Sequence, residues 1–367
     1  MRIIVSLLLA LVWAITAVNS AWAQEDPPPL EGASVSGIVV NLTTGDPAPE
    51  GLSVMLHGWS ADGEQRVMLH GESVLGGVFS FEDVQLEPDV LYAAMAVYQD
   101  VTYISTPTQL LEDGGLESLR IEVYETTGSD DHVTIDQHHI ILGFAQGGLS
   151  VAEIYTLTNG GDRTVKDAIL LEDDRSATLQ FPLPAGAANL SFPTAPSDRF
   201  IPRAGGFADT RPLIPGAQAG QVVVAYILQY DDELTLEHIV PYDTERISVL
   251  LPHASGLSLD SDAAEYLGTE TFADGESYET YQLGASSAGD RIALSLSGRP
   301  EAQTSGMGSA SASRTGSEEG IALGIGVLGL TLIAAGVWWW RRERIEADVP
   351  EEEGLDHDAA EEQGSEL

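Results

Sequence analysis

The stretch Leu119-Arg120-Ile121-Glu122-Val123 decides the fold class of this chain. Its apolar residues occupy every second position. Because successive side chains on a β-strand point to opposite faces, such a strand has one apolar and one polar face. This alternation predicts a half-buried strand of an antiparallel sheet. The same period recurs at Leu52 to Leu56, Leu179 to Leu183 and Ile292 to Leu296.

Turn-forming residues separate these runs at short intervals. Examples are Thr43-Thr44-Gly45-Asp46-Pro47, Asn159 to Asp162 and Pro184-Ala185-Gly186. Glycine allows the positive φ of tight turns, and proline presets φ without needing a ladder hydrogen bond. Many short strands with frequent turns predict an all-β ectodomain of tandem β-sandwiches rather than a parallel α/β sheet.

The amino terminus reads as a secretory signal peptide, residues 1–23. Met1-Arg2 is a short positive region, an apolar run follows, and Ala21-Trp22-Ala23 has the small-x-small form of a cleavage site. An uncleaved anchor helix is the alternative. The polar, proline-rich lead-in that follows, residues 24–32, favours cleavage.

A second apolar run predicts one transmembrane helix over residues 320–340. Ile321 to Trp340 carries no charge and is followed by Arg341-Arg342, which the positive-inside rule places in the cytoplasm. We therefore expect a single-pass type I membrane protein with an extracytoplasmic ectodomain and a cytoplasmic tail. Gly320 and Gly324 form a small-xxx-small pair, which is compatible with a homodimer through this helix.

The ectodomain divides where the polar, turn-prone residues 126–131 interrupt the strand pattern. We expect one sandwich over 33–125 and a second over 132–298. Residues 257–298 either complete the second sandwich or form a separate small unit. The Gly- and Ser-rich residues 299–319 predict a flexible linker before the membrane.

Charge and cysteine content limit the partners and the chemistry. The chain has 57 acidic residues against 16 Lys and Arg, a net charge of −41, and no cysteine. This charge repels nucleic acid, and the lack of thiols excludes disulfides and thiolate metal sites. The acidic tail, residues 341–367, predicts a disordered cytoplasmic segment, with a docking peptide for a basic partner as the alternative.

The first module carries a recognisable set of motifs. A Gly-x-Val-type strand at Ser36 to Val40, the Thr-x-Gly-x-Pro turn at Thr43 to Pro47 and the Gly-x-Phe-x-Phe strand at Gly77 to Phe81 resemble the carboxypeptidase regulatory-like (transthyretin-like) β-sandwich domain. The resemblance covers about 90 residues and implies a spacer, stabilising or binding module. The second module, with Gly148 to Tyr155, resembles a generic immunoglobulin-like sandwich.

Motifs for catalysis are absent from the sequence. None of the eight histidines is followed three residues later by Glu, so the His-x-x-Glu zinc pair of carboxypeptidases is missing. No Gly-x-Ser-x-Gly or phosphate-loop motif occurs, and Lys166 is the sole lysine. We therefore predict a non-enzyme with no catalytic or cofactor-binding residues.

Two groups of residues are candidate metal ligands. His132, His138 and His139 are close in sequence, but neighbouring residues on a strand face opposite ways, and only Asp136 and His138 are expected to share a face. The prediction is therefore ordinary imidazoles and no metal site. Acidic pairs could help bind Ca²⁺, although none has a spaced EF-hand loop: Asp130-Asp131, Asp173-Asp174, Asp231-Asp232 and Asp260/Asp262.

The predicted function follows from these architectural parts. We expect a non-catalytic, membrane-anchored envelope protein that binds, spaces or scaffolds other envelope components, its partner being an envelope protein or a glycan. One alternative is a carbohydrate-binding surface protein that stacks sugar rings on aromatic residues of the first module. The other is a hydrolase with a site assembled from distant loops. The aromatic candidates are Trp59, Tyr92, Tyr98 and Tyr103.

Overall fold

A computed structural model describes residues 30–299, apart from residues 62, 112–113, 146–147, 173, 197, 262 and 273–274. The described part is built from strands and turns without a helix, so the all-β prediction is confirmed. The expected signal peptide, membrane span and acidic tail lie outside this part, as does the linker beyond residue 299. Within it, no helical segment is long and apolar enough to cross a bilayer.

The chain forms two compact units. Among the described residues, the first unit comprises 30–127 together with 161–165, and the second comprises 128–160 and 166–299. The division falls at Thr127, inside the polar stretch that interrupts the strand pattern in the sequence. The inclusion of 161–165 in the first unit was not expected.

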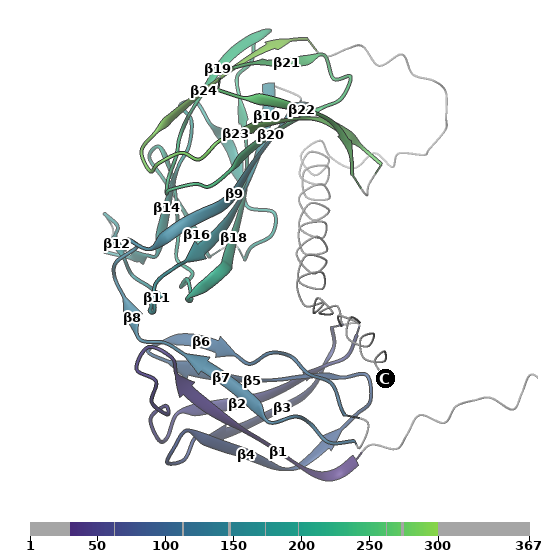
Figure 1. Cartoon of the computed structure of the whole chain (residues 1–367), viewed down its shortest axis with the longest axis vertical. Coiled ribbons are helices and arrows are strands. Elements are labelled where there is room, and N and C mark those ends of the chain that lie inside the picture. The colour runs from purple at the N-terminus through teal and green to yellow at the C-terminus, as the bar shows by residue number, and fades with distance from the viewer. Residues whose placement is uncertain are drawn as a thin grey trace, which may run out of the picture. The chain divides into compact units, whose positions relative to one another are not determined.

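The first unit is a sandwich of two sheets (Figure 1). One sheet has the order β4-β1-β7, and the other has the order β3-β2-β5-β6. Their apolar faces share one core, which includes Phe79 and Ile121 from the first sheet and Leu56 and Ala94 from the second. The strands are β1 (Leu30–Asn41), β2 (Ser53–Trp59), β3 (Gln65–Glu72), β4 (Val78–Leu86), β5 (Leu91–Tyr98), β6 (Val101–Ile104) and β7 (Leu119–Val123).

Gly37 allows β1 to lie between its two neighbours. It pairs with Phe79 of β4 and with Leu119 of β7, and the β1–β7 pairing is parallel. A Cβ atom at this position would lie 2.1 Å from the carbonyl oxygen of Leu119 and 2.3 Å from the Phe79 ring. Glycine is therefore required here by close backbone approach, which explains one element of the sequence motif in this strand.

A short segment from later in the chain completes the first unit. β11 (Thr164–Val165) pairs in parallel with β8 (Thr126–Thr127). The amide of Thr164 also donates to the carbonyl of Glu125, and its hydroxyl bonds to that of Tyr103 at 2.8 Å. Residues 161–165 are thus hydrogen-bonded parts of the first unit.

The second unit is built on a seven-stranded sheet with the order β15-β18-β10-β9-β20-β23-β22. At its centre the long hairpin β9–β10 is antiparallel, whereas β20 runs parallel to β9. The strands are β9 (Val133–Ala145), β10 (Gly148–Asn159), β15 (Ala188–Ser191), β18 (Gly216–Leu228), β20 (Ile247–Pro252), β22 (Glu265–Thr271) and β23 (Ser277–Leu283).

Two smaller sheets cover one face of this large sheet. Contacts to Tyr155 and Glu153 of β10 come from Phe181 on one small sheet and His238 on the other. The first small sheet contains β14 (Leu179–Pro182), β17 (Gly206–Asp209) and β16 (Phe200–Arg203), and the second contains β19 (Glu233–Ile239), β24 (Arg291–Gly298) and β21 (Leu257–Asp260). A further pair joins β12 (Ile169–Leu170) to β13 (Ser176–Ala177).

Residues 257–298 complete the second sandwich. β21 and β24 pair with each other and β24 pairs with β19, while β23 extends the seven-stranded sheet beside β20. These pairings answer the question that the sequence left open. The region adds strands to existing sheets and is grouped with the second unit.

Candidate functional site

A cluster of ionisable side chains lies inside the core of the second unit. Glu153 comes from β10, His138 from the neighbouring β9, and His238 from β19 in the covering sheet. Their side chains are 0%, 1% and 1% exposed. Among the described residues they form the one group of three or more metal-ligating types whose ligand atoms lie within 4.8 Å of one another.

The carboxylate of Glu153 is held by three hydrogen bonds. Nε2 of His138 lies 2.7 Å from Oε2, and the Tyr155 hydroxyl donates to the same oxygen. The Tyr226 hydroxyl donates to Oε1 at 2.5 Å. Both tyrosines are buried, so both carboxylate oxygens have partners that compensate for the loss of water.

His238 is less well accommodated than the other members. Its Nδ1 lies 3.7 Å from Oε2 of Glu153, which is beyond hydrogen-bond distance. Its Nε2 is buried and has no hydrogen-bond partner. The His138 ring stacks on Tyr155 at a centroid distance of 4.2 Å and packs against His238 at 4.9 Å. His238 therefore sits at the cluster without a direct hydrogen bond to the carboxylate.

Burial and charge shift the pKa values of the cluster in defined directions. Burial by itself would raise the pKa of Glu153, but the neighbouring His238 and His138, with the Tyr155 hydrogen bond, lower it to about 2. Burial lowers the pKa of His238 to about 4, against the attraction of Glu153. Burial, then the Glu153 charge, raises the pKa values of Tyr155 and Tyr226. At neutral pH the cluster holds an ionised Glu153 and a neutral His238.

The three histidines named from the sequence separate in the structure. His132 is exposed, His138 faces the core, and His139 lies on the opposite face of β9. Burial, with the positive charges of His138 and Arg246, lowers the pKa of His139 to about 4. The expectation that neighbouring histidines face opposite ways is confirmed.

The expectation that Asp136 and His138 share a face is wrong. The β9–β10 pairing shifts register between Gln137 opposite Thr156 and Ile135 opposite Leu157. This bulge gives β9 one extra residue. As a result Ile135 and His138, three positions apart, both face the core, and Asp136 does not. Asp136 instead accepts a hydrogen bond of 2.8 Å from the Thr158 hydroxyl.

Sequence reasoning missed Glu153 and His238, although each left a signal. Glu153 interrupts the buried alternation of Leu149, Val151, Tyr155 and Leu157 on β10. His238 follows the alternating Leu234 and Leu236 on β19. A polar residue in phase with a buried apolar stripe must find a partner in the core. Only the fold shows that Glu153 and His238 lie next to each other.

The acidic pairs considered for Ca²⁺ are not gathered into a site within the described part of the chain. None of Asp130, Asp131, Asp174, Asp231, Asp232 or Asp260 belongs to a group of three convergent ligands there, and Asp173 and Asp262 lie outside the described residues. Asp232 pairs with Arg299 at the surface.

Two of the four aromatic residues considered for sugar stacking are core residues. Tyr92 is 0% and Tyr103 is 3% exposed. Their hydroxyls bond inside the first unit, Tyr92 with the amide of Glu87 and Tyr103 with the carbonyl of Tyr124. Trp59 remains half-buried on the outward face of β2, where it stacks on His57 at 5.3 Å.

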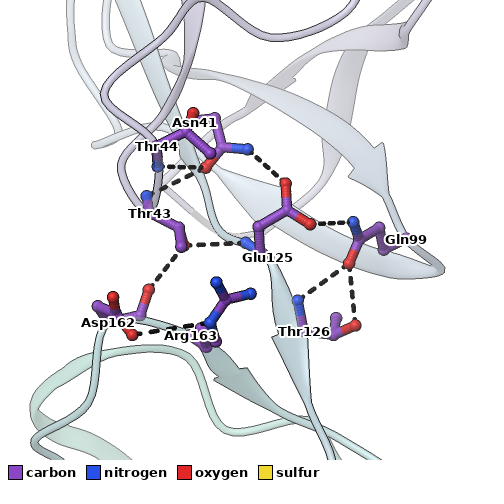
Figure 2. A network of polar contacts seen from close by, with 8 residues as sticks. All are labelled: Asn41, Thr43, Thr44, Gln99, Glu125, Thr126, Asp162 and Arg163. Carbon is purple, nitrogen blue, oxygen red and sulfur yellow. Dashed lines mark hydrogen bonds and ion pairs between the residues drawn. The ribbon is translucent and has the colours of Figure 1, made fainter.

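Tyr98, the fourth aromatic, donates a hydrogen bond to Glu125. Glu125 lies at the centre of a polar network with Asn41 and Gln99 (Figure 2). Oε1 of Glu125 accepts from Tyr98 at 2.7 Å and from Asn41 at 2.8 Å, and Oε2 accepts from Gln99 at 2.5 Å. These hydrogen bonds, with the charge of Arg163, lower the pKa of Glu125 against a smaller effect of burial. The network keeps this carboxylate ionised.

Thr43 connects the same network to the returning segment 161–165 (Figure 2). Its hydroxyl accepts from the amide of Glu125 at 3.0 Å and donates to the carbonyl of Asp162 at 2.6 Å. On the other side, the side-chain Oε1 of Gln99 accepts from the backbone amide and the hydroxyl of Thr126, each at 2.9 Å. The network therefore joins four separate chain segments of the first unit.

Comparisons with known proteins do not assign the chain to a family. No family model matches it, and no curated protein matches it. Among solved structures, it is similar to the full-length major pilin SpaD from Corynebacterium diphtheriae, with 9% identity, a TM-score of 0.19, and coverage of 69% of this chain and 81% of the pilin.

Proposed function

We propose that this chain is a non-catalytic, single-pass membrane-anchored envelope protein whose β-sandwiches bind, space or scaffold other envelope components. The observation that carries the proposal is the order of its parts. Two sandwich units occupy residues 30–299, between a signal peptide predicted from residues 1–23 and a membrane span predicted from residues 320–340. A leader and a stop-transfer span would place both units outside the cytoplasm.

The resemblance of the first unit to carboxypeptidase regulatory-like domains is part of this proposal. Its motif residues occupy structural positions: Gly37 allows close packing of three strands, and Phe79 and Phe81 fill the core. Residues in these positions maintain the packing of the sandwich and place no requirement on the residues of its outer surface. This favours a spacing or binding module over a catalytic one.

Topology is tested on the full chain in membranes. A reporter that works only in the cytoplasm, fused after Leu367, should be active, and protease added from outside should remove the region preceding the span. A matched fusion placed after residue 299 should be inactive in the cytoplasm. A carboxyl-terminal fusion that is active only outside would contradict the proposal.

The partner is tested by purifying the intact membrane protein and identifying what is retained with it. A stable envelope-protein partner without glycan retention would support the scaffold. Turnover of a peptide or ester library by the same preparation, lost on chelation, would support the hydrolase alternative and overturn the proposed function.

Carbohydrate binding is the second candidate, and Trp59 favours it. The ring lies on the outward face of β2, stacked on His57, and its cross-strand neighbour Leu91 is 40% exposed. Flat aromatic and apolar surface of this kind can stack against the faces of sugar rings. A polysaccharide array should show glycan retention that is lost on Trp59→Ala and kept on Tyr266→Ala, an exposed aromatic of the second unit. No retention by the native chain would rule this candidate out.

A further inference from the structure

We propose that His138, Glu153 and His238 bind a divalent transition-metal ion of the zinc class as a buried three-donor site in the second sandwich. Two imidazoles and one carboxylate are donors that such ions accept. They come from β9, β10 and β19, so a bound ion would join the central hairpin of the large sheet to the covering sheet.

The spacing of the His238 and Glu153 donor atoms is close to that of two ligands of one ion. Two ligand atoms that are each about 2.1 Å from a tetrahedral ion lie about 3.4 Å apart. Nδ1 of His238 and Oε2 of Glu153 are 3.7 Å apart, which is too far for a hydrogen bond and close to that spacing. Nε2 of His138 is 2.7 Å from the same oxygen, so binding exchanges this hydrogen bond for two metal–ligand bonds.

A hydrogen-bonded cluster without metal accounts for only part of the arrangement. It explains Glu153, whose oxygens accept from His138, Tyr155 and Tyr226. It does not explain why the buried His238, 1% exposed, directs its Nδ1 at the carboxylate without a hydrogen bond to it. A metal ligand at this position accounts for a buried imidazole directed at a carboxylate from beyond hydrogen-bond distance.

The surroundings supply outer-shell hydrogen bonds to the carboxylate of the proposed site. Metal-ligating carboxylates are themselves held by hydrogen bonds, and here the Tyr155 and Tyr226 hydroxyls orient Glu153. The three donors are at most 1% exposed, so a bound ion would be shielded from bulk solvent, and a tetrahedral ion would keep its fourth position for a small ligand such as water. A hard ion such as Ca²⁺ needs six to eight oxygen ligands, so two imidazole donors select against it.

The test uses the purified full chain, refolded from denaturant with Zn²⁺, with Ca²⁺ or with a chelator. Refolding is needed because buried donors exchange an ion slowly with solvent. After gel filtration, elemental analysis should find about one Zn²⁺ per chain, and Zn²⁺ but not Ca²⁺ should raise the melting temperature by mass action on the folded state. X-ray absorption at the zinc edge should show a nitrogen and oxygen shell with imidazole scattering.

Variants then assign the site. His238→Gln and Glu153→Gln should remove bound Zn²⁺, whereas Tyr226→Phe should weaken it by about 10- to 100-fold. His139→Ala, the adjacent residue on the opposite face, should retain one equivalent. Circular dichroism identifies variants that have not folded, and the absorption measurement on the native chain needs no variant. Folded native chain without zinc, a sulfur- or water-only shell, or undiminished zinc in His238→Gln would overturn the proposal.

Discussion

The hydroxyl of Thr43 donates a 2.6 Å hydrogen bond to the carbonyl of Asp162, 119 residues further along the chain. The same hydroxyl accepts from the amide of Glu125. One side chain thus joins three segments: the turn after β1, Glu125 in the connection between β7 and β8, and the returning segment 161–165. This contact adds to the β8–β11 pairing that holds 161–165 in the first unit, although most of its sequence neighbours belong to the second.

Thr43→Val should destabilise the first unit by about 1–2 kcal/mol, because two hydrogen bonds are lost at nearly constant volume. Urea unfolding measures the loss, and hydrogen exchange should become faster at residues 161–165. Thr102→Val, an exposed threonine of β6, is the matched control and should change little. Unchanged exchange at 161–165 would show that Thr43 does not hold this segment.

Glu125 should make the stability of the first unit depend on pH in a defined direction. Its folded pKa is lowered by hydrogen bonds from Tyr98, Gln99 and Asn41, so between the folded and unfolded pKa values the unfolded state binds more protons. The stabilisation is therefore present above the ordinary carboxyl pKa and is lost as the pH falls through the lowered folded value.

The measurement compares urea unfolding of the native chain and Glu125→Gln at pH 7 and about pH 3. The native chain should be the more stable at pH 7, and the difference should shrink at the lower pH. Glu72→Gln, at the exposed end of β3, controls for the general loss of one negative charge. A difference that stays constant with pH would contradict the assignment.

Gly37→Ala should destabilise the first unit by about 3 kcal/mol or more, because its Cβ would clash with the Leu119 carbonyl and the Phe79 ring. Circular dichroism and chemical unfolding report the loss. Gly284→Ala, where nothing lies within 4 Å of the added Cβ, should change little. Equal effects of the two substitutions would show that close approach at Gly37 is not the cause.

Tyr226→Phe should destabilise the second unit by about 2–3 kcal/mol, because it leaves Oε1 of a buried, ionised Glu153 without its partner. Equilibrium denaturation measures the change. Tyr266→Phe is the control, since the Tyr266 side chain is 53% exposed. A loss no larger than that of the control would mean that Glu153 finds another donor.

Much of the fold was predictable because strand periodicity is local. The alternation at Leu119 to Val123, Leu179 to Leu183 and Ile292 to Leu296 coincides with β7, β14 and β24. Such a pattern reports which residues face a core without reference to the strand's partners. The all-β class was therefore readable from the sequence, and the two compact units divide within its polar stretch, at Thr127.

The candidate site was only partly predictable, because its members are joined by strand pairing and by packing across the core. His138 was recognised as a possible ligand, but the bulge in β9 decided which side it faces, and a bulge depends on pairing with β10. Glu153 and His238 looked like isolated polar residues in apolar stripes. Their approach depends on the stacking of two sheets, which no local pattern encodes.

The sequence by itself determined the fold class, through strands from period-two alternation and turns from glycine and proline, and it predicts a leader and a membrane span from two apolar runs. Tertiary structure alone decided which strands pair, that residues 161–165 return to the first unit, and that His138, Glu153 and His238 meet in one buried cluster. The physical reason is the separation along the chain over which each kind of interaction acts. Periodicity acts between near neighbours in the chain, whereas register and sheet packing join residues far apart in it.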